Sequence, residues 1–258
     1  LSDHESVEWF NDTGFEFTIL TSLNNNISTL SIDTTGAREG LFKRGYREKS
    51  TEAPIKETMA AALVLLSYWN KDRILYDPMC GSGTIPIEAA LIGRNIAPGL
   101  NRTFEAQKWP AVKEEYWKAA KIEARKKIDF NSKIKIYGSD ISQKAVKIAE
   151  ENAIEAGVDD CIEFFVKDIN TLDKTPYEYG ILITNPPYGD RIGELTSIEN
   201  IHRKLGQVFG RDLTWSNYII TAVETFEKEF GKKADRKRKL FNGDLKVDYY
   251  QYFGKKPE

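Results

Sequence analysis

The sequence is poor in the residues that bind metal ions or form disulfide frameworks. Its 258 residues include 2 cysteines and 2 histidines. Cys80 and Cys161 lie in unrelated contexts, and His4 and His202 lie far apart in the chain. Cysteines so placed form neither a disulfide framework nor a metal quartet, and two distant histidines do not indicate a metal site. We therefore expect the functional site to hold no metal.

Long apolar runs and an excess of positive charge are also missing. No apolar stretch reaches the roughly 18 residues of a membrane helix, so we expect a soluble, cytoplasmic protein without a membrane partner. Hydrophobic residues still make up 41% of the chain, which is normal for a globular core. The 37 basic and 39 acidic residues give a net charge of -2. With this balance, RNA binding requires either that basic residues cluster locally or that another domain makes most of the contacts with RNA phosphates.

The N-terminal segment is distinct from the rest. The chain begins with Leu1 rather than Met and has no charged-then-apolar leader, so we expect a fragment of a longer protein. Alternating apolar and polar residues at 15–23 and 27–33, separated by Asn24-Asn25-Asn26, predict a β-hairpin. The expected division is residues 1–50, a small appendage, and residues 51–258, the main domain.

Beyond residue 50 the sequence alternates between strand and helix patterns. Strands are expected at residues 73–77, 133–139, 162–167, 180–184 and 217–221. Helices are expected at residues 54–69, 85–94, 112–128, 142–156 and 198–209, with a short one near Phe226. The Asn242-Gly243-Asp244 turn between residues 236–241 and 245–253 predicts a closing hairpin. This order predicts a Rossmann-like α/β fold, a doubly wound and mostly parallel sheet with a C-terminal antiparallel hairpin and ligands at the carboxyl ends of its strands.

The first candidate site is the turn after the first of these strands, Asp77-Pro78-Met79-Cys80-Gly81-Ser82-Gly83-Thr84. Gly81 and Gly83 allow a tight turn and close approach of the backbone to a ligand. The following helix presents unpaired N–H groups to that ligand. A dinucleotide site would need a glycine where Pro86 stands, and Asp77 would repel a pyrophosphate but attract a cationic or amino-bearing ligand. A plain strand-to-helix turn is the alternative.

Two further carboxylates follow later strands. Asp140, with Ile141 after it, ends the second strand, where a carboxylate can accept both hydroxyl hydrogens of a ribose. It reads equally well as the cap of the next helix, although Ser142 competes for that role. Asp168 follows the third strand and could accept from an adenine amino group while Ile169 packs on the ring. Such turn positions are commonly aspartate, so this pattern is weak alone.

The most informative motif is Asn185-Pro186-Pro187-Tyr188, directly after the strand at residues 180–184. Two prolines stiffen the backbone and withhold N–H donors, which leaves the Pro186 carbonyl and the Asn185 side-chain oxygen free to accept from one amino group. An amino group on a base is a weak nucleophile, because its lone pair is delocalised into the ring. Two acceptors would favour tetrahedral geometry and stabilise the charge that develops on alkylation. Tyr188 could stack on the flat base, and a rigid turn without function is the alternative.

Together these motifs resemble the class I S-adenosylmethionine-dependent methyltransferases that act on amino groups. The sequence is more closely similar to one branch, the THUMP-associated guanine-N2 methyltransferases of large-subunit ribosomal RNA. The resemblance covers nearly the whole chain from about Trp9. It rests on residues 77–84 and 185–191, and on shorter segments at residues 32–36, 43–47, 53–57, 87–90, 96–99 and 239–243.

The resemblance implies a seven-stranded sheet, S-adenosylmethionine as cofactor, S-adenosylhomocysteine as product, and guanine N2 in ribosomal RNA as acceptor. The expected cofactor-binding residues are Pro54, Asp77, Pro78, Cys80, Gly81, Ser82, Gly83, Thr84, Asp140, Ile141, Asp168, Ile169 and Asn185. The expected catalytic residues are Asn185, Pro186, Pro187 and Tyr188. The resemblance also implies a THUMP domain before residue 1 that supplies much of the RNA grip, and we expect a monomer.

The sequence leaves alternatives open. The tetrapeptide suits guanine N2 and adenine N6 alike, so a methyltransferase acting on transfer RNA or DNA is one alternative, although no DNA target-recognition domain fits this length. A non-catalytic cofactor- or RNA-binding module is another, and Pro86 and Asp77 disfavour a third, a dinucleotide-dependent oxidoreductase. The basic runs at residues 232–239 and 43–47 suggest RNA contacts, or in the first case an edge strand kept soluble by its charge.

Overall fold

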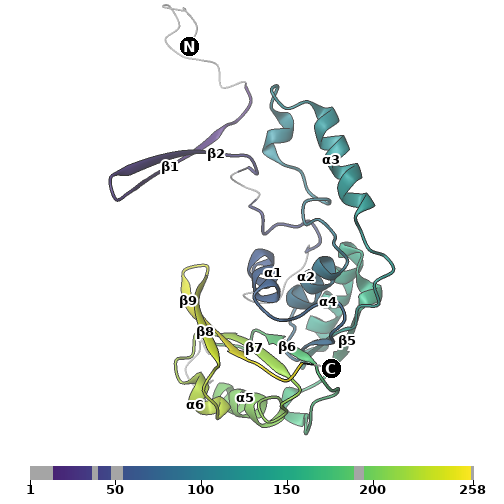
Figure 1. Ribbon diagram of the computed structural model, residues 1–258, viewed down its shortest axis with the longest axis vertical. Coiled ribbons are helices and arrows are strands. Elements are labelled where there is room, and N and C mark those ends of the chain that lie inside the picture. Colours follow the sequence, from purple (N-terminus) through teal and green to yellow (C-terminus); the bar gives the residue numbers. More distant parts are fainter. Residues whose placement is uncertain (1–13, 37–39, 48–54, 189–194, 257–258) are drawn as a thin grey trace, which may run out of the picture.

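A seven-stranded sheet is the largest feature of the computed structural model, which describes residues 14–36, 40–47, 55–188 and 195–256 (Figure 1). Its strands lie in the order β5-β4-β3-β6-β7-β9-β8. They are β3 (Leu75–Asp77), β4 (Ile136–Asp140), β5 (Ile162–Val166), β6 (Ile181–Thr184), β7 (Ser216–Thr221), β8 (Arg236–Asn242) and β9 (Leu245–Tyr252). β9 is antiparallel to β7 and β8, and the other pairs are parallel. The predicted mostly parallel sheet with an antiparallel closing hairpin is confirmed.

Helices cover both faces of this sheet. They are α1 (Glu57–Leu65), α2 (Thr84–Gly93), α4 (Gln143–Ala156), α5 (Leu195–Val208) and α6 (Phe226–Phe230). α3 (Glu114–Lys126) has no buried residue and lies apart from the sheet in Figure 1. Figure 1 shows α1, α2 and α4 on one face and α5 and α6 on the other, and each group packs into its own core cluster. Ile181 and Ile183 point into the first cluster, whereas Leu182 points into the second. Burial on both faces explains why β6 is a continuous apolar run.

The predicted boundaries hold best where the chain carries a capping residue. Ser142 caps α4 by accepting from the Ala145 N–H at 3.3 Å, and Gly157 ends the helix in the left-handed region with φ 69°. α1 is shorter than the helix predicted at residues 54–69. It ends early because the Ser67 hydroxyl donates to the Val64 carbonyl at 2.6 Å, and the chain then turns away.

The N-terminal hairpin forms a separate two-stranded sheet, β1 (Thr18–Asn24) with β2 (Ile27–Asp33). Asn25 and Asn26 both have positive φ, 50° and 61°, the conformation of a two-residue hairpin turn that asparagine tolerates. Figure 1 shows this purple hairpin projecting away from the seven-stranded sheet. The predicted hairpin is therefore confirmed, whereas the domain boundary at residue 50 stays a prediction. No helix in the described ranges is long and apolar enough to cross a membrane.

Candidate cofactor and target site

The turn between β3 and α2 has the tight backbone that its glycines predict. Gly81 and Gly83 have φ of 53° and 81°, a region that favours glycine. A Cβ on Gly83 would approach the Ala149 Cβ to 2.9 Å, so the loop lies directly against α4. Asn152 of α4 donates to the Ser82 carbonyl at 3.0 Å from a buried position. The loop is thus held in shape by the helix behind it, and Asn152 was not among the predicted residues.

Asp77 lies at the centre of the site and is almost fully buried, with 2% of its surface exposed. Its Oδ1 accepts from the Thr184 hydroxyl at 2.7 Å and from the Met79 N–H at 3.2 Å. Burial raises the pKa of this carboxyl to about 7 although both hydrogen bonds lower it. Thr184 immediately precedes Asn185, so one buried hydrogen bond joins the glycine loop to the Asn-Pro-Pro-Tyr loop. Thr184 was missed in the sequence because it is the last residue of an apolar run.

Asp140 contacts the same glycine loop from the neighbouring strand. Its Oδ2 accepts from the Gly81 N–H at 3.0 Å, and its Oδ1 accepts from the Ser142 N–H at 2.9 Å. Because Ser142 itself caps α4, the competition for the helix cap is decided in favour of Ser142. Ile141 is 68% exposed beside this carboxylate and presents an apolar surface at the strand end. The arrangement leaves Asp140 at the mouth of the loop with backbone donors on both oxygens.

Asp168 and Ile169 differ in their surroundings. The Asp168 Oδ1 accepts from the backbone and side-chain nitrogens of Asn170, at 2.9 and 3.0 Å, and so holds a local turn. Ile169 is 5% exposed and packs into the second core cluster, which includes Tyr76 and Leu182. The Ile169 side chain is therefore part of the protein core, and its predicted packing on a ligand ring stays a prediction. Asp168 remains half-buried at the end of β5.

The Asn-Pro-Pro-Tyr loop differs in one respect from its predicted geometry. The Tyr188 hydroxyl donates to the Asn185 Oδ1, an oxygen that we predicted to be free. The Tyr188 ring packs against the first core cluster, which brings its hydroxyl back over Asn185. Pro186 is buried, whereas Pro187 is exposed and Asn185 is half-buried. A substrate amino group would therefore share the Asn185 oxygen with Tyr188 or displace its hydroxyl.

Four neighbouring strands bring these residues together at one edge of the sheet. β5, β4, β3 and β6 are adjacent and parallel, so their carboxyl ends carry Asp168, Asp140, Asp77 and Asn185 in that order. Pro54, also predicted to line the cofactor site, lies outside the described residues. Among the residues that the structure does describe, no group of three His, Cys, Asp or Glu side chains could hold a metal ion.

The basic segment at residues 43–47 serves a structural purpose. Arg44 and the Tyr46 hydroxyl both reach Glu88 of α2, at 3.4 and 3.1 Å, and Glu88 is 2% exposed. Arg47 forms an ion pair of 3.2 Å with Glu57 of α1. Burial raises the pKa of both carboxyls, against the lowering effect of the arginines. These arginines are therefore engaged inside the protein, and the two buried glutamates were not predicted.

The basic run at residues 232–239 lies along the edge strand. β8 runs in the same direction as β7, because both are antiparallel to β9. Its first residues therefore lie level with the amino ends of the parallel strands and its last residues level with their carboxyl ends. Lys237 is engaged, because it forms a 2.9 Å ion pair with Asp248 and donates to the Tyr250 hydroxyl at 3.2 Å. Lys239 is the residue of this run that lies nearest the carboxyl edge of the sheet.

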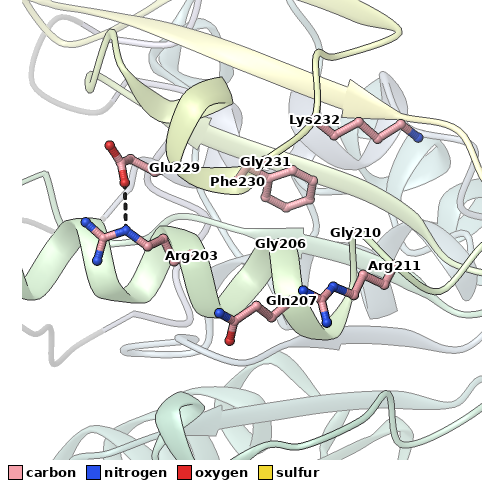
Figure 2. Close-up of a pocket in the computed structure, with 9 residues that line it drawn as sticks. All are labelled: Arg203, Gly206, Gln207, Gly210, Arg211, Glu229, Phe230, Gly231 and Lys232. Carbon is pink, nitrogen blue, oxygen red and sulfur yellow. Dashed lines mark hydrogen bonds and ion pairs between the residues drawn. The ribbon is translucent and has the colours of Figure 1, made fainter.

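Two surface hollows lie away from the predicted site. One, of about 270 Å³, lies between α5 and the segment from Glu229 to Lys232, and Figure 2 shows Arg203 bonded to Glu229 across it. Arg211 and Lys232 precede β7 and β8, so this hollow lies at the amino edge of the sheet, opposite the glycine loop. The other, of about 510 Å³, lies beside α2 and α3. Neither is lined by a residue that we predicted for the cofactor or the target.

Comparison with protein families matches residues 44–251 to the RMKL-like methyltransferase domain. Curated relatives include "Putative RNA methyltransferase YpsC" of Bacillus subtilis, 46% identical over 99% of this chain and 66% of that protein. Another is "Ribosomal RNA large subunit methyltransferase K/L" of Shewanella baltica, 37% identical over 92% of this chain and 34% of that protein. The chain thus spans about two thirds of the first relative and one third of the second.

Solved structures share this fold, and one of the two that follow is described with a ligand. One is described as "SMU.472, a putative methyltransferase complexed with SAH", with a TM-score of 0.86, 45% identity, and coverage of 95% of this chain and 64% of that one. Another is a "predicted N6-adenine-specific DNA methylase" from Listeria monocytogenes, with a TM-score of 0.84, 46% identity, and coverage of 93% and 61%. The names of these similar proteins agree on methyl transfer and differ on the nucleic acid.

Proposed function

The chain belongs to the RMKL-like methyltransferase domain family, and from this premise we propose that it methylates an amino group of a base in large-subunit ribosomal RNA, with S-adenosylmethionine as donor. We further propose guanine N2 as the acceptor. The observation that carries the proposal is the buried hydrogen bond between Thr184 and Asp77, because it fixes the target loop against the cofactor loop. The names of the K/L and YpsC relatives support RNA as the substrate.

The strand ends suit S-adenosylmethionine by the chemistry of their side chains. Asp140 offers a carboxylate to ribose hydroxyls, and the exposed Ile141 offers an apolar surface to a ring. Asp77, in its ionised form, would offer negative charge to an ammonium group. Gly81 and Gly83 keep side chains out of the turn. When bound, S-adenosylmethionine supplies an electrophilic methyl group on a positively charged sulfur. The similar structure described with SAH supports the same cofactor here.

The target loop would position and polarise the base. The Asn185 Oδ1 and the Pro186 carbonyl accept the two hydrogens of the exocyclic amino group and direct its nitrogen lone pair towards the methyl group. The Asn185 oxygen has two lone pairs, so it can accept one hydrogen while Tyr188 donates to the other lone pair. The methylated nitrogen becomes acidic and releases its proton to water, and rate comes from positioning rather than from a strong base.

Adenine N6 is the second candidate acceptor. It rests on the name of the Listeria structure and on the loop chemistry, since Asn185 and Pro186 would hold any amino group on a planar base. A non-catalytic module remains the alternative from another class. The proposal also includes a THUMP domain, which the resemblance implies, together with a monomeric state and a cytoplasmic location.

Methyl transfer to matched nucleic acids tests the proposal. The purified chain is incubated with methyl-labelled S-adenosylmethionine and either an unmethylated large-subunit ribosomal RNA transcript or DNA of the same sequence. We expect label in the RNA with wild-type protein and none in the DNA. Label in DNA alone would contradict the RNA assignment. Failure with both, from a folded protein that binds S-adenosylhomocysteine and at RNA concentrations raised to saturation, would favour the non-catalytic module.

A further inference from the structure

The β8–β9 hairpin extends beyond the carboxyl edge of the sheet. Thr221, the last residue of β7, pairs with Asp248 of β9. Beyond this pair, where β7 has ended, β8 and β9 continue to pair with each other. The three further pairs are Leu240 with Val247, Phe241 with Lys246 and Asn242 with Leu245. At about 3.3 Å per residue the hairpin rises roughly 10 Å beyond the end of β7. Figure 1 shows this yellow hairpin projecting past the neighbouring strands.

The projecting tip lies on the same edge as the target loop. β6 ends at Thr184, which pairs with Ile219 of β7, two residues before β7 itself ends. Only β7 separates β6 from β9, so β9 lies about 10 Å from β6 and β8 about 14 Å, at about 4.8 Å per strand. A base held at Asn185 would therefore have its neighbouring nucleotides within reach of the tip.

The tip carries an exposed aromatic ring between two cations. Phe241 is 65% exposed although it belongs to a regular strand. Lys246 is its partner on the ladder and Lys239 precedes it by two residues, so all three side chains share one face of the hairpin. Both lysines are exposed, and the ion pair of the nearby Asp248 is made with Lys237. An aromatic ring for stacking beside cations for phosphates is the chemistry that binds single-stranded RNA.

We propose that this tip, residues 239–246, is a second RNA-binding element of the site. Phe241 stacks on an unpaired base that flanks the target nucleotide, and Lys239 and Lys246 contact the adjoining phosphates. The element holds the strand open beside the base that enters the target loop, which must leave its stack to be methylated. This inference rests on the proposed function, because it takes RNA to be the substrate.

Kinetics of three variants of the full chain test the element. Phe241→Ala should raise the KM for the unmethylated ribosomal RNA transcript about fivefold to a hundredfold, the usual loss for one stacked base. Phe241→Tyr, which keeps the ring, should stay within about twofold of wild type. Phe130→Ala is the matched control, since Phe130 is 67% exposed on another surface. The affinity for S-adenosylhomocysteine should be the same in all, because none of these residues touches the glycine loop.

The two lysines are tested by salt dependence. Replacing both Lys239 and Lys246 by glutamine should reduce the slope of log KM against log salt by about 1.4, for two phosphate contacts on a single strand. A wild-type KM in Phe241→Ala would overturn the inference and leave the proposed function intact. If the wild-type chain binds S-adenosylhomocysteine but transfers no methyl group even when the RNA concentration is raised to saturation, the proposed function fails. The inference is then decided by binding of a fluorescein-labelled single-stranded RNA 12-mer, and equal affinities of wild type and Phe241→Ala would overturn it.

Discussion

Acidification should weaken cofactor binding through one buried carboxyl group. Burial raises the pKa of Asp77 to about 7, from an ordinary value of 3.8. If the carboxylate form attracts the cofactor's ammonium group, its protonation below pH 7 competes with binding. The dissociation constant for S-adenosylhomocysteine should then rise about tenfold for each pH unit below about 7. Between pH 7, where half of the carboxyl is already protonated, and pH 5.5 this amounts to about 1.6 kcal/mol, or roughly sixteenfold.

Few other groups would produce the same profile. The α-amino group of the ligand stays charged below pH 7. His202, the histidine within the described residues, is buried without a hydrogen-bond partner, and burial lowers its pKa to about 4. Calorimetric titrations from pH 5.5 to 7.5 measure the effect, with Asp77→Asn as the matched control that should bind weakly and without the slope. A flat profile for the wild-type protein would refute the reasoning.

The stability of the unliganded protein should respond in the opposite direction. The folded pKa of Asp77 lies above its unfolded value, so the native state binds more protons between pH 4 and pH 7. This contribution to stability is fully present below about pH 4 and is lost as the pH rises through 7. It amounts to at most about 4 kcal/mol. Thr184→Val removes a hydrogen bond that lowers the pKa, so it should move the midpoint of the binding profile to higher pH.

Three further substitutions test separate parts of the site. Asn185→Ala should abolish methyl transfer and leave the affinity for S-adenosylhomocysteine nearly unchanged. Wild-type turnover in this variant would contradict the role given to Asn185. Asp140→Ala should weaken cofactor binding by about 1–3 kcal/mol in calorimetry, because it leaves ribose hydroxyls unpaired, and an unchanged affinity would argue against that contact. Arg44→Ala should lower the free energy of unfolding by about 3–5 kcal/mol, because it removes the cation that faces the buried Glu88. Denaturant unfolding measures this change. A loss below about 1 kcal/mol would show that Glu88 is protonated in the native state.

The fold was predictable because its patterns are local. Apolar runs of strand length, the Asn-Gly turn before Asp244 and the capping pair Ser142 and Gly157 each specify their own element. The glycine loop and the Asn-Pro-Pro-Tyr loop were recognisable for the same reason, since each is a continuous segment. The predicted end of α1 was wrong, and there the last carbonyls accept hydrogen bonds from a distant strand: Tyr249 donates to the Leu63 carbonyl and Gln251 to the Leu66 carbonyl.

Contacts between distant segments were not predictable from the sequence. Thr184 and Asp77 are 107 residues apart, and nothing in the pattern of β6 marks its last residue as a hydrogen-bond donor to the glycine loop. Nothing in the sequence marks Glu57 and Glu88 as buried partners of arginine. Their roles follow only from the packing of α1 and α2 against residues 43–47. The hydrogen bond from Tyr188 to Asn185 depends on how the ring packs, which a tetrapeptide does not specify.

The identity of the methylated nucleoside tests the central proposal most directly. The chain is incubated with deuterated-methyl S-adenosylmethionine and an unmethylated large-subunit ribosomal RNA transcript, and the RNA is digested to nucleosides for mass spectrometry. The account predicts labelled N2-methylguanosine from the wild-type protein and none from Asn185→Ala. Labelled N6-methyladenosine, or a label that persists in Asn185→Ala, would contradict it.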